Sequence, residues 1–148
     1  VVRQLPDQHY NIVTSGTNIA TELSQRSKCN VTLIGGQVNG NTLSCSGPQA
    51  ESFLDGVNID IAIMATSGYS LNNGFTSGSF YERQLKRKVI EKARVVIMLM
   101  DLSKIDHSMP YTFAALPDIN VLISDAPLPR EIQDEAERHN VTLRCGET

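Results

Sequence analysis

The sequence predicts an α/β fold in which a mainly parallel β-sheet is the middle of three α/β/α layers. Short apolar runs rich in Ile and Val alternate along the chain with segments whose apolar residues recur at helical spacing. The runs 60–65 and 95–100 are apolar almost throughout, as strands buried on both faces of a parallel sheet are. Because alternating strands and helices favour a parallel sheet covered on both faces, the fold is expected to be Rossmann-like.

The composition is that of a globular domain. Its 148 residues are 41% hydrophobic and 20% charged, which suffices for a core. The net charge of −3 argues against strong nucleic-acid binding by this chain alone. No apolar run is long enough to span a bilayer and no signal peptide is visible, so we expect a cytoplasmic protein without membrane contact. Cys29, Cys45 and Cys145 lack paired spacing, which predicts reduced thiols instead of a disulfide framework or a zinc site.

The start of the chain has the character of a helix end. Residues 1–6, Val-Val-Arg-Gln-Leu-Pro, contain no initiator methionine and read like a last helical turn. No domain boundary, low-complexity segment or true repeat is visible. We therefore expect residues 1–148 to form a single effector-binding domain, truncated at its amino terminus.

The first part of the chain predicts strands and helices in alternation. Gly47-Pro48 is expected to open a helix, because proline fits the first helical position. The expected elements are a strand at 11–14, a helix at 17–26, a strand at 30–34, an extended segment at 37–46 with a turn at 39–41, and the helix that starts at 47–48.

The second part continues the alternation. The glycine-, serine- and asparagine-rich segment 67–79 is expected to be a loop, and the helix after it has Leu85, Val89 and Ile90 on one side. The expected elements are strands at 60–65, 95–100, 120–124 and 141–143, a helix at 81–93, and a helix from Pro129 to Asn140.

Small and hydroxylated residues follow several predicted strands. The tripeptide Thr-Ser-Gly occurs at 14–16, 66–68 and 76–78, and Gly35-Gly36 ends another apolar run. Ligands of open α/β sheets bind at the carboxyl edge, where glycine permits close approach and successive N–H groups can hold an anion. The pattern predicts a pocket for a small polar, anionic molecule. Ordinary turns between strands and helices are the alternative, since Gly and Ser are common in them.

Charged residues near these strand ends are further candidates. Lys86 lies one helical turn from Glu82, and a lysine there can reach a phosphate at a neighbouring strand end. An exposed ion pair on a basic helix is the alternative for this pair. Lys104 follows the strand 95–100 closely, and it is either a ligand contact or a solvated loop lysine.

Taken together, the motifs resemble the carboxyl-terminal effector-sensing domain of the DeoR family of bacterial transcription regulators. The resemblance covers nearly the whole chain in the right order. The matching stretches are Asn11-Ile12-Val13-Thr14, Ile19-Ala20-x-x-Leu23, Val31-Thr32-Leu33-Ile34-Gly35-Gly36, Ser46-Gly47-Pro48, Ala50-Glu51, Asp60-Ile61-Ala62, Gly68, Gly74-Phe75-Thr76, Glu82-x-x-Leu85-Lys86-Arg87, Asp101-x-Ser103-Lys104, and Asp118-Ile119-Asn120-Val121-Leu122-Ile123 followed by Asp125.

The resemblance implies the fold of ribose-5-phosphate isomerase and the CoA transferases, and a sensing role without cofactor, metal or catalytic residue. A phosphorylated sugar or polyol would bind here and change the operator DNA affinity of a homo-oligomeric regulator, usually a repressor. Its winged helix-turn-helix is not in this chain. The expected moving element is the loop 67–79. The expected effector contacts are Thr14, Ser15, Gly16, Gly35, Gly36, Gly68, Thr76, Glu82, Lys86 and Lys104.

The chain departs from the family pattern at two places. Thr14-Ser15-Gly16 stands where relatives usually have Thr-Asn-Ser. Family domains also begin earlier, with a strand that ends in an Asp/Ser-Gly-Thr-Thr loop, a segment that this sequence does not contain. The pocket residues named above are therefore expected to be an incomplete set.

A sugar-phosphate isomerase-like enzyme on the same fold is the alternative function. Glu82 would be its general base and Lys86 would stabilise an enediolate. However, Thr66-Ser67-Gly68-Tyr69 replaces the acidic strand-end motif expected of such an isomerase, and we identify no second catalytic carboxylate. We therefore expect a sensor and not an enzyme.

Overall fold

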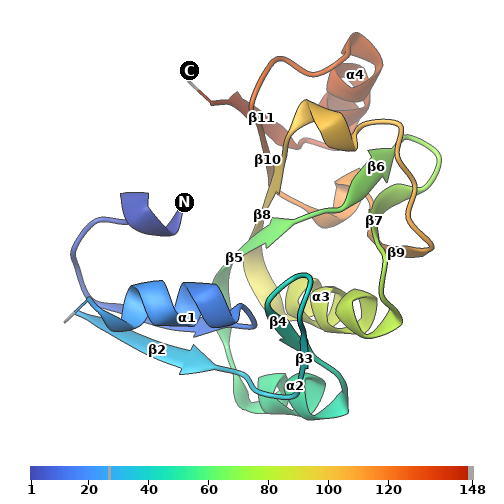
Figure 1. The fold of residues 1–148 in the computed structure, drawn as a ribbon. Helices are drawn as coiled ribbons and strands as arrows, with labels where there is room; N and C mark the ends of the chain where they lie inside the picture. Colours follow the sequence, from blue (N-terminus) through green and yellow to red (C-terminus); the bar gives the residue numbers. More distant parts are fainter. Residues whose placement is uncertain (27, 147–148) are drawn as a thin grey trace. The chain divides into compact units, whose positions relative to one another are not determined.

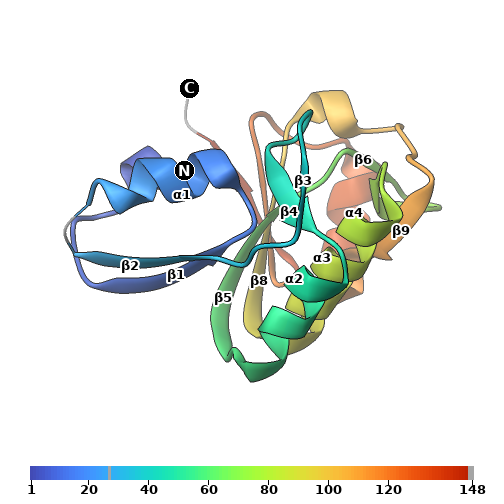
Figure 2. The same ribbon diagram turned by 60° about the horizontal axis from the view of Figure 1, so that its bottom comes forward.

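The computed structural model describes residues 1–26 and 28–146. The chain divides into two compact units, residues 1–56 and residues 57–148. Both units combine strands with helices, and the largest sheet is entirely parallel (Figures 1 and 2). The predicted α/β class with a mainly parallel sheet is thereby confirmed.

Residues 1–56 contain a pair of parallel strands joined through a helix. Strand β1 pairs with β2 from Tyr10 opposite Cys29 to Thr14 opposite Leu33. Pro48 occupies the first turn of its helix, as expected. The elements of this unit are η1 (Val2–Gln4), β1 (Tyr10–Thr14), α1 (Thr17–Ser24), β2 (Cys29–Leu33), β3 (Gln37–Asn39), β4 (Ser44–Ser46), α2 (Pro48–Phe53) and η2 (Leu54–Gly56).

The main sheet of residues 57–148 has four parallel strands. Their spatial order is β11 (Thr142–Cys145), β10 (Val121–Ser124), β8 (Ala93–Met100) and β5 (Ile59–Ala65). Helix α3 (Phe80–Lys92) precedes β8, and α4 (Arg130–Arg138) joins β10 to β11. Along the chain from β5 to β11, each strand of this sheet lies on the same side of the strand before it. Since crossovers between parallel strands are right-handed, the connections lie over the same face of the sheet.

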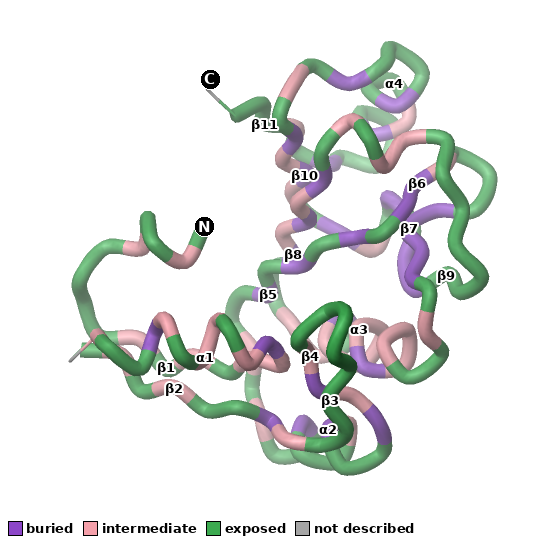
Figure 3. The backbone as a smooth tube through the Cα atoms, in the orientation of Figure 1, coloured by how far each residue is buried: buried purple, intermediate pink, exposed green. Residues whose placement is uncertain are grey.

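The core lies between that face and the two helices. Met98 of β8 and Leu122 of β10 are fully buried, and Ile132 of α4 is buried with them in the same core cluster. Buried segments of β8, β10 and α4 are purple in Figure 3. On the other face, Ile61 and Ile63 of β5 are 59% and 48% exposed. The expectation that these strands are buried on both faces therefore holds for only one face of β5.

The predicted loop 67–79 is a β-hairpin instead. Strands β6 (Gly68–Ser70) and β7 (Gly74–Ser77) pair antiparallel, and β7 also pairs with β9 (Tyr111–Ala114), which the sequence did not predict. The glycines here serve close packing. Gly74 has φ +71°, and a Cβ there would lie 2.3 Å from the Ala114 carbonyl oxygen.

Two short turns complete this unit, η3 (Leu102–Lys104) and η4 (Leu116–Asp118). The final helix ends close to the predicted point, where Asn140 has a positive φ of 56°. None of the helices in residues 1–26 and 28–146 combines the length and the apolar character that crossing a membrane requires.

Candidate functional site

A cavity of about 390 Å³ lies at the carboxyl ends of three neighbouring parallel strands, β5, β8 and β10. This is the edge at which ligands of open α/β sheets bind. Its lining combines apolar side chains with hydroxyl and charged groups. The lining residues are Ala65, Thr66, Leu99, Met100, Asp101, Lys104, Ile123, Ser124 and Asp125.

The turn after β8 carries the charged side of the rim. The Asp101 carboxylate caps this turn, because its Oδ1 accepts hydrogen bonds from the Ser103 amide at 2.9 Å and from the Ser103 hydroxyl. The hydroxyl bond is the main reason why the pKa of Asp101 lies below its usual value, and the nearby Lys104 ammonium lowers it further. Asp101 is thus held ionised beside the predicted contact Lys104.

A second carboxylate comes from the neighbouring strand. Asp125, directly after β10, accepts a hydrogen bond on Oδ1 from the Leu102 amide at 2.9 Å. Next to it, the buried Ser124 hydroxyl donates to the Ala126 carbonyl at 2.7 Å. The site prediction omitted Asp125, although its place after an apolar strand is the signal that identified Lys104.

Thr66 closes the β5 side of the cavity. Its buried hydroxyl donates to the Gly68 carbonyl at 2.7 Å and is 3.1 Å from the Thr76 carbonyl oxygen. These bonds tie the end of β5 to the β6–β7 hairpin. Thr66 therefore links the wall of the cavity to the second sheet of this unit, which β6, β7 and β9 form.

Two predicted contacts, Gly68 and Thr76, lie inside that second sheet and do not line the cavity. The Thr76 side chain is fully buried; its hydroxyl donates to the Gly68 carbonyl at 3.2 Å and accepts from the Met109 amide at 2.9 Å. A Cβ on Gly68 would lie 2.4 Å from the His107 carbonyl oxygen. In this structure both residues pack the hairpin against its surroundings.

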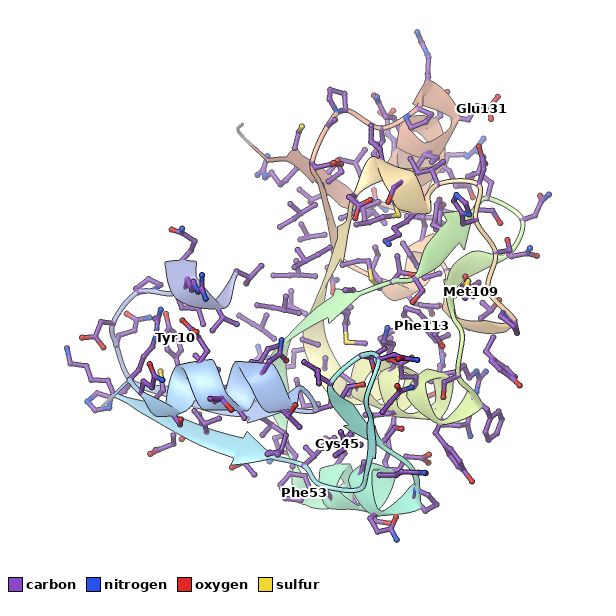
Figure 4. The ribbon with its side chains drawn as sticks, viewed as in Figure 1. Tyr10, Cys45, Phe53, Met109, Phe113 and Glu131 are labelled. Carbon is purple, nitrogen blue, oxygen red and sulfur yellow. The ribbon has the colours of Figure 1, made fainter. Side chains whose placement is uncertain are left out.

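Lys86 reaches the end of β5 from helix α3. Its Nζ donates to the Ala65 carbonyl at 2.8 Å and lies 4.8 Å from the centre of the Phe113 ring, which is labelled in Figure 4. Burial lowers the pKa of Lys86, and the charge of Glu82 opposes that shift. Lys86 holds a residue of the cavity wall but does not line the cavity.

The other predicted contacts lie together in residues 1–56, at the carboxyl ends of β1 and β2. The Thr14 hydroxyl accepts from the Gly16 amide at 3.0 Å, and the Ser15 carbonyl accepts from the Cys45 amide at 2.7 Å. Gly35 and Gly36 have φ values of +78° and +102°. A Cβ on Gly36 would lie 2.6 Å from a carbonyl oxygen, whereas open space surrounds Gly35.

A second cavity, of about 450 Å³, lies between α4 and the start of β11. Its lining contains Glu137, Gln133 and Asn140 but neither lysine nor arginine. Although this cavity is larger, its lining carries no cation and it lies away from the carboxyl edge of the sheet. We therefore assign the site to the smaller cavity at the ends of β5, β8 and β10. Within residues 1–26 and 28–146, no group of three His, Cys, Asp or Glu side chains could hold a metal ion.

Comparison with known families matches residues 1–126 to the DeoR C-terminal sensor domain. The chain belongs to this family. The resemblance found in the sequence is thus confirmed over the strands and turns that form the cavity.

Individual relatives of this DeoR sensor domain are regulators by name. This chain is 32% identical over 134 residues to the HTH-type transcriptional regulator GlpR of Haloferax volcanii, and the match covers 90% of this chain and 52% of the relative. It is 28% identical over 141 residues to the HTH-type transcriptional regulator IolR of Bacillus subtilis, covering 95% and 56%. The Glycerol-3-phosphate regulon repressor of Escherichia coli is 23% identical over 139 residues, covering 94% and 55%. The chain spans about half the length of these relatives.

Proposed function

We propose that this sensor domain binds a phosphorylated sugar or polyol, and that binding changes the affinity of the full-length regulator for operator DNA. The names of two relatives, a glycerol-3-phosphate regulon repressor and an L-fucose operon activator, support a link with carbohydrate metabolism. They also differ in the sign of regulation. We propose a repressor that acts as a homo-oligomer in the cytoplasm.

The observation that carries this proposal is the mixed charge of the cavity at the carboxyl ends of β5, β8 and β10. Carboxylates accept hydrogen bonds from sugar hydroxyls, and an ammonium donates to a phosphate. Asp101 and Asp125 supply the first kind of group and Lys104 supplies the second. A cavity of about 390 Å³ is within the range that small-molecule sites occupy.

Several predicted effector contacts do not line the cavity, and the proposal does not place them in direct contact with a ligand there. Lys86 acts on the cavity through the Ala65 carbonyl. Thr14, Ser15, Gly16, Gly35 and Gly36 stay predicted effector contacts of residues 1–56, to be tested by their own substitutions.

A catalytic role has less support than binding. An isomerase would need Glu82 and Lys86 directed at a substrate, whereas the Lys86 ammonium is hydrogen-bonded to a main-chain carbonyl. The relatives GlpR and IolR are named as transcriptional regulators. We therefore infer that the domain reports on a metabolite without converting it.

Thermal-shift screening of the full-length protein tests the proposal. The panel pairs sugar and polyol phosphates with their unphosphorylated parents. A ligand at a hundred times its dissociation constant stabilises the folded state by about 2.7 kcal/mol, so we expect a clear rise of Tm with at least one phosphorylated compound. The same compound should change operator binding in a mobility-shift assay. Absence of any shift across the phosphorylated compounds would refute the proposed effector class.

A further inference from the structure

Three amides of the turn that follows β8, those of Leu102, Ser103 and Lys104, all donate hydrogen bonds within the protein. The Leu102 amide donates to Asp125 and the Ser103 amide donates to Asp101, both at 2.9 Å. The Lys104 amide donates to the Asp101 carbonyl at 3.1 Å. A phosphate usually binds at such a turn through free N–H groups. Here the carboxylates of two adjacent strands occupy that place.

The charges around the cavity add to this effect. Lys104 is the only cation among the residues that line the cavity, against the two carboxylates of Asp101 and Asp125. One Lys104 ammonium can neutralise part of one anionic group on a ligand. A second anionic group near β10 would meet a carboxylate without a compensating cation in the lining.

Asp125 retains an acceptor for a ligand. Its Oδ1 is bonded to the Leu102 amide, and no hydrogen bond to its Oδ2 is found within residues 1–26 and 28–146. An ionised carboxylate accepts hydrogen bonds from hydroxyl groups but cannot donate to a phosphate. The β10 side of the cavity is therefore matched to a hydroxyl group.

We propose that Asp125 is a specificity-determining residue, which makes the β10 side of the cavity accept a hydroxyl group and reject a second anionic group. This inference rests on the proposed function, because it assumes that the cavity binds the effector. It narrows the effector class to monophosphates of sugars or polyols and excludes bisphosphates. The selectivity comes from repulsion of the wrong ligand as well as attraction of the right one.

Mannitol phosphates give a matched pair of probes. The two ends of mannitol are equivalent by symmetry, so mannitol 1-phosphate and mannitol 1,6-bisphosphate differ only by a hydroxyl replaced by a phosphate. By titration calorimetry, we expect the protein to bind the monophosphate at least about tenfold more tightly. Asp125→Asn keeps an oxygen for the Leu102 amide but removes the charge. It should reduce this ratio to about threefold or less, through tighter bisphosphate binding.

Asp118→Asn is the control, because Asp118 also accepts a main-chain hydrogen bond, from the Ala115 amide at 2.8 Å, but lies outside the cavity. It should leave the ratio unchanged. The proposal is overturned if wild type binds the bisphosphate as tightly as the monophosphate, or if Asp125→Asn preserves the wild-type ratio.

Inorganic phosphate provides a second readout that does not depend on the effector. In NMR titrations, the Leu102 amide signal should shift saturably and farther in Asp125→Ala, where the amide is freed, than in wild type, where phosphate contacts only the nearby Lys104. A shift of the same size in both proteins would overturn the proposal. If neither mannitol phosphate binds, this titration alone decides, so failure of the proposed function and failure of this inference are distinguishable.

Discussion

At the residue scale, Lys86 shows how a predicted ligand contact can act through the main chain. Its ammonium is bonded to the Ala65 carbonyl at the end of β5 and lies over the Phe113 ring. A charged group in such a place loses hydration, and these two contacts offset part of the loss. Substitution of Lys86 should therefore affect the cavity wall and the stability of the fold together.

The lowered pKa of Lys86 predicts a pH dependence of stability. Below its usual pKa of 10.5, the unfolded chain binds a proton more readily at Lys86 than the folded chain does. The contribution of Lys86 to the free energy of unfolding should therefore rise with pH between its lowered pKa and 10.5. Urea denaturation of wild type and Lys86→Met across this range measures the difference.

Arg83 supplies the control for this measurement. It lies on the same helix and donates through Nε to the Thr112 carbonyl at 2.9 Å, and arginine as a residue type is not deprotonated in proteins. The difference between wild type and Arg83→Gln should not vary with pH. A flat or falling difference for Lys86→Met would contradict the account of Lys86. We also expect Lys86→Ala to weaken the effector response more than Arg83→Ala does.

At the element scale, residues 67–79 form a packed hairpin of β6 and β7 that supports the cavity, where the sequence predicted a loop. Phe75 is fully buried and contacts the rings of Tyr69 and Phe113, with ring centres 4.6 and 6.4 Å apart. Burial also raises the pKa of Tyr69 to about 12. Because the hairpin is bonded to Thr66, its packing helps to fix the end of β5.

Gly74→Ala should destabilise the domain by about 1–3 kcal/mol, because the position has a positive φ and the added Cβ would press on the Ala114 carbonyl. Gly40→Ala is the matched control, since nothing lies within 4 Å of an added Cβ there. It should change the free energy of unfolding by less than about 1 kcal/mol. Equal effects of the two substitutions in urea denaturation would show that the hairpin is loosely packed.

The elements that the sequence predicted correctly share one property, a continuous apolar run or a clear helical period. Strand β8 and helix α3 are examples, and both lie close to their predicted bounds. Strands β6, β7 and β9 are three or four residues long, and the sheet they form depends on the pairing of β7 with β9, a segment distant in the chain. In so short a strand, the sequence does not distinguish a glycine needed for close packing from a glycine needed for a flexible turn. The glycine-rich residues 67–79 therefore have the composition of a loop.

At the scale of the whole molecule, the candidate site was only partly predictable. Lys104 was predicted because it follows an apolar strand, and it lines the cavity; the same rule would have added the lining residues Asp101 and Asp125. Thr76 was predicted from its motif, but it does not line the cavity, and its buried hydroxyl bonds to the Gly68 carbonyl and the Met109 amide. Which polar residue near a strand end faces a cavity depends on the tertiary pairing of its neighbours, and no local pattern encodes that pairing.

The central claim is that the cavity at the ends of β5, β8 and β10 binds the effector of this DeoR-family sensor. Titration calorimetry of the full-length protein and its Lys104→Ala variant, with a phosphorylated compound that shifts the Tm, tests it most directly. We expect Lys104→Ala to weaken binding about tenfold or more while the Tm of the free protein changes little, because a charge-assisted contact is lost. Unchanged affinity of Lys104→Ala would contradict the assignment of the effector site to this cavity.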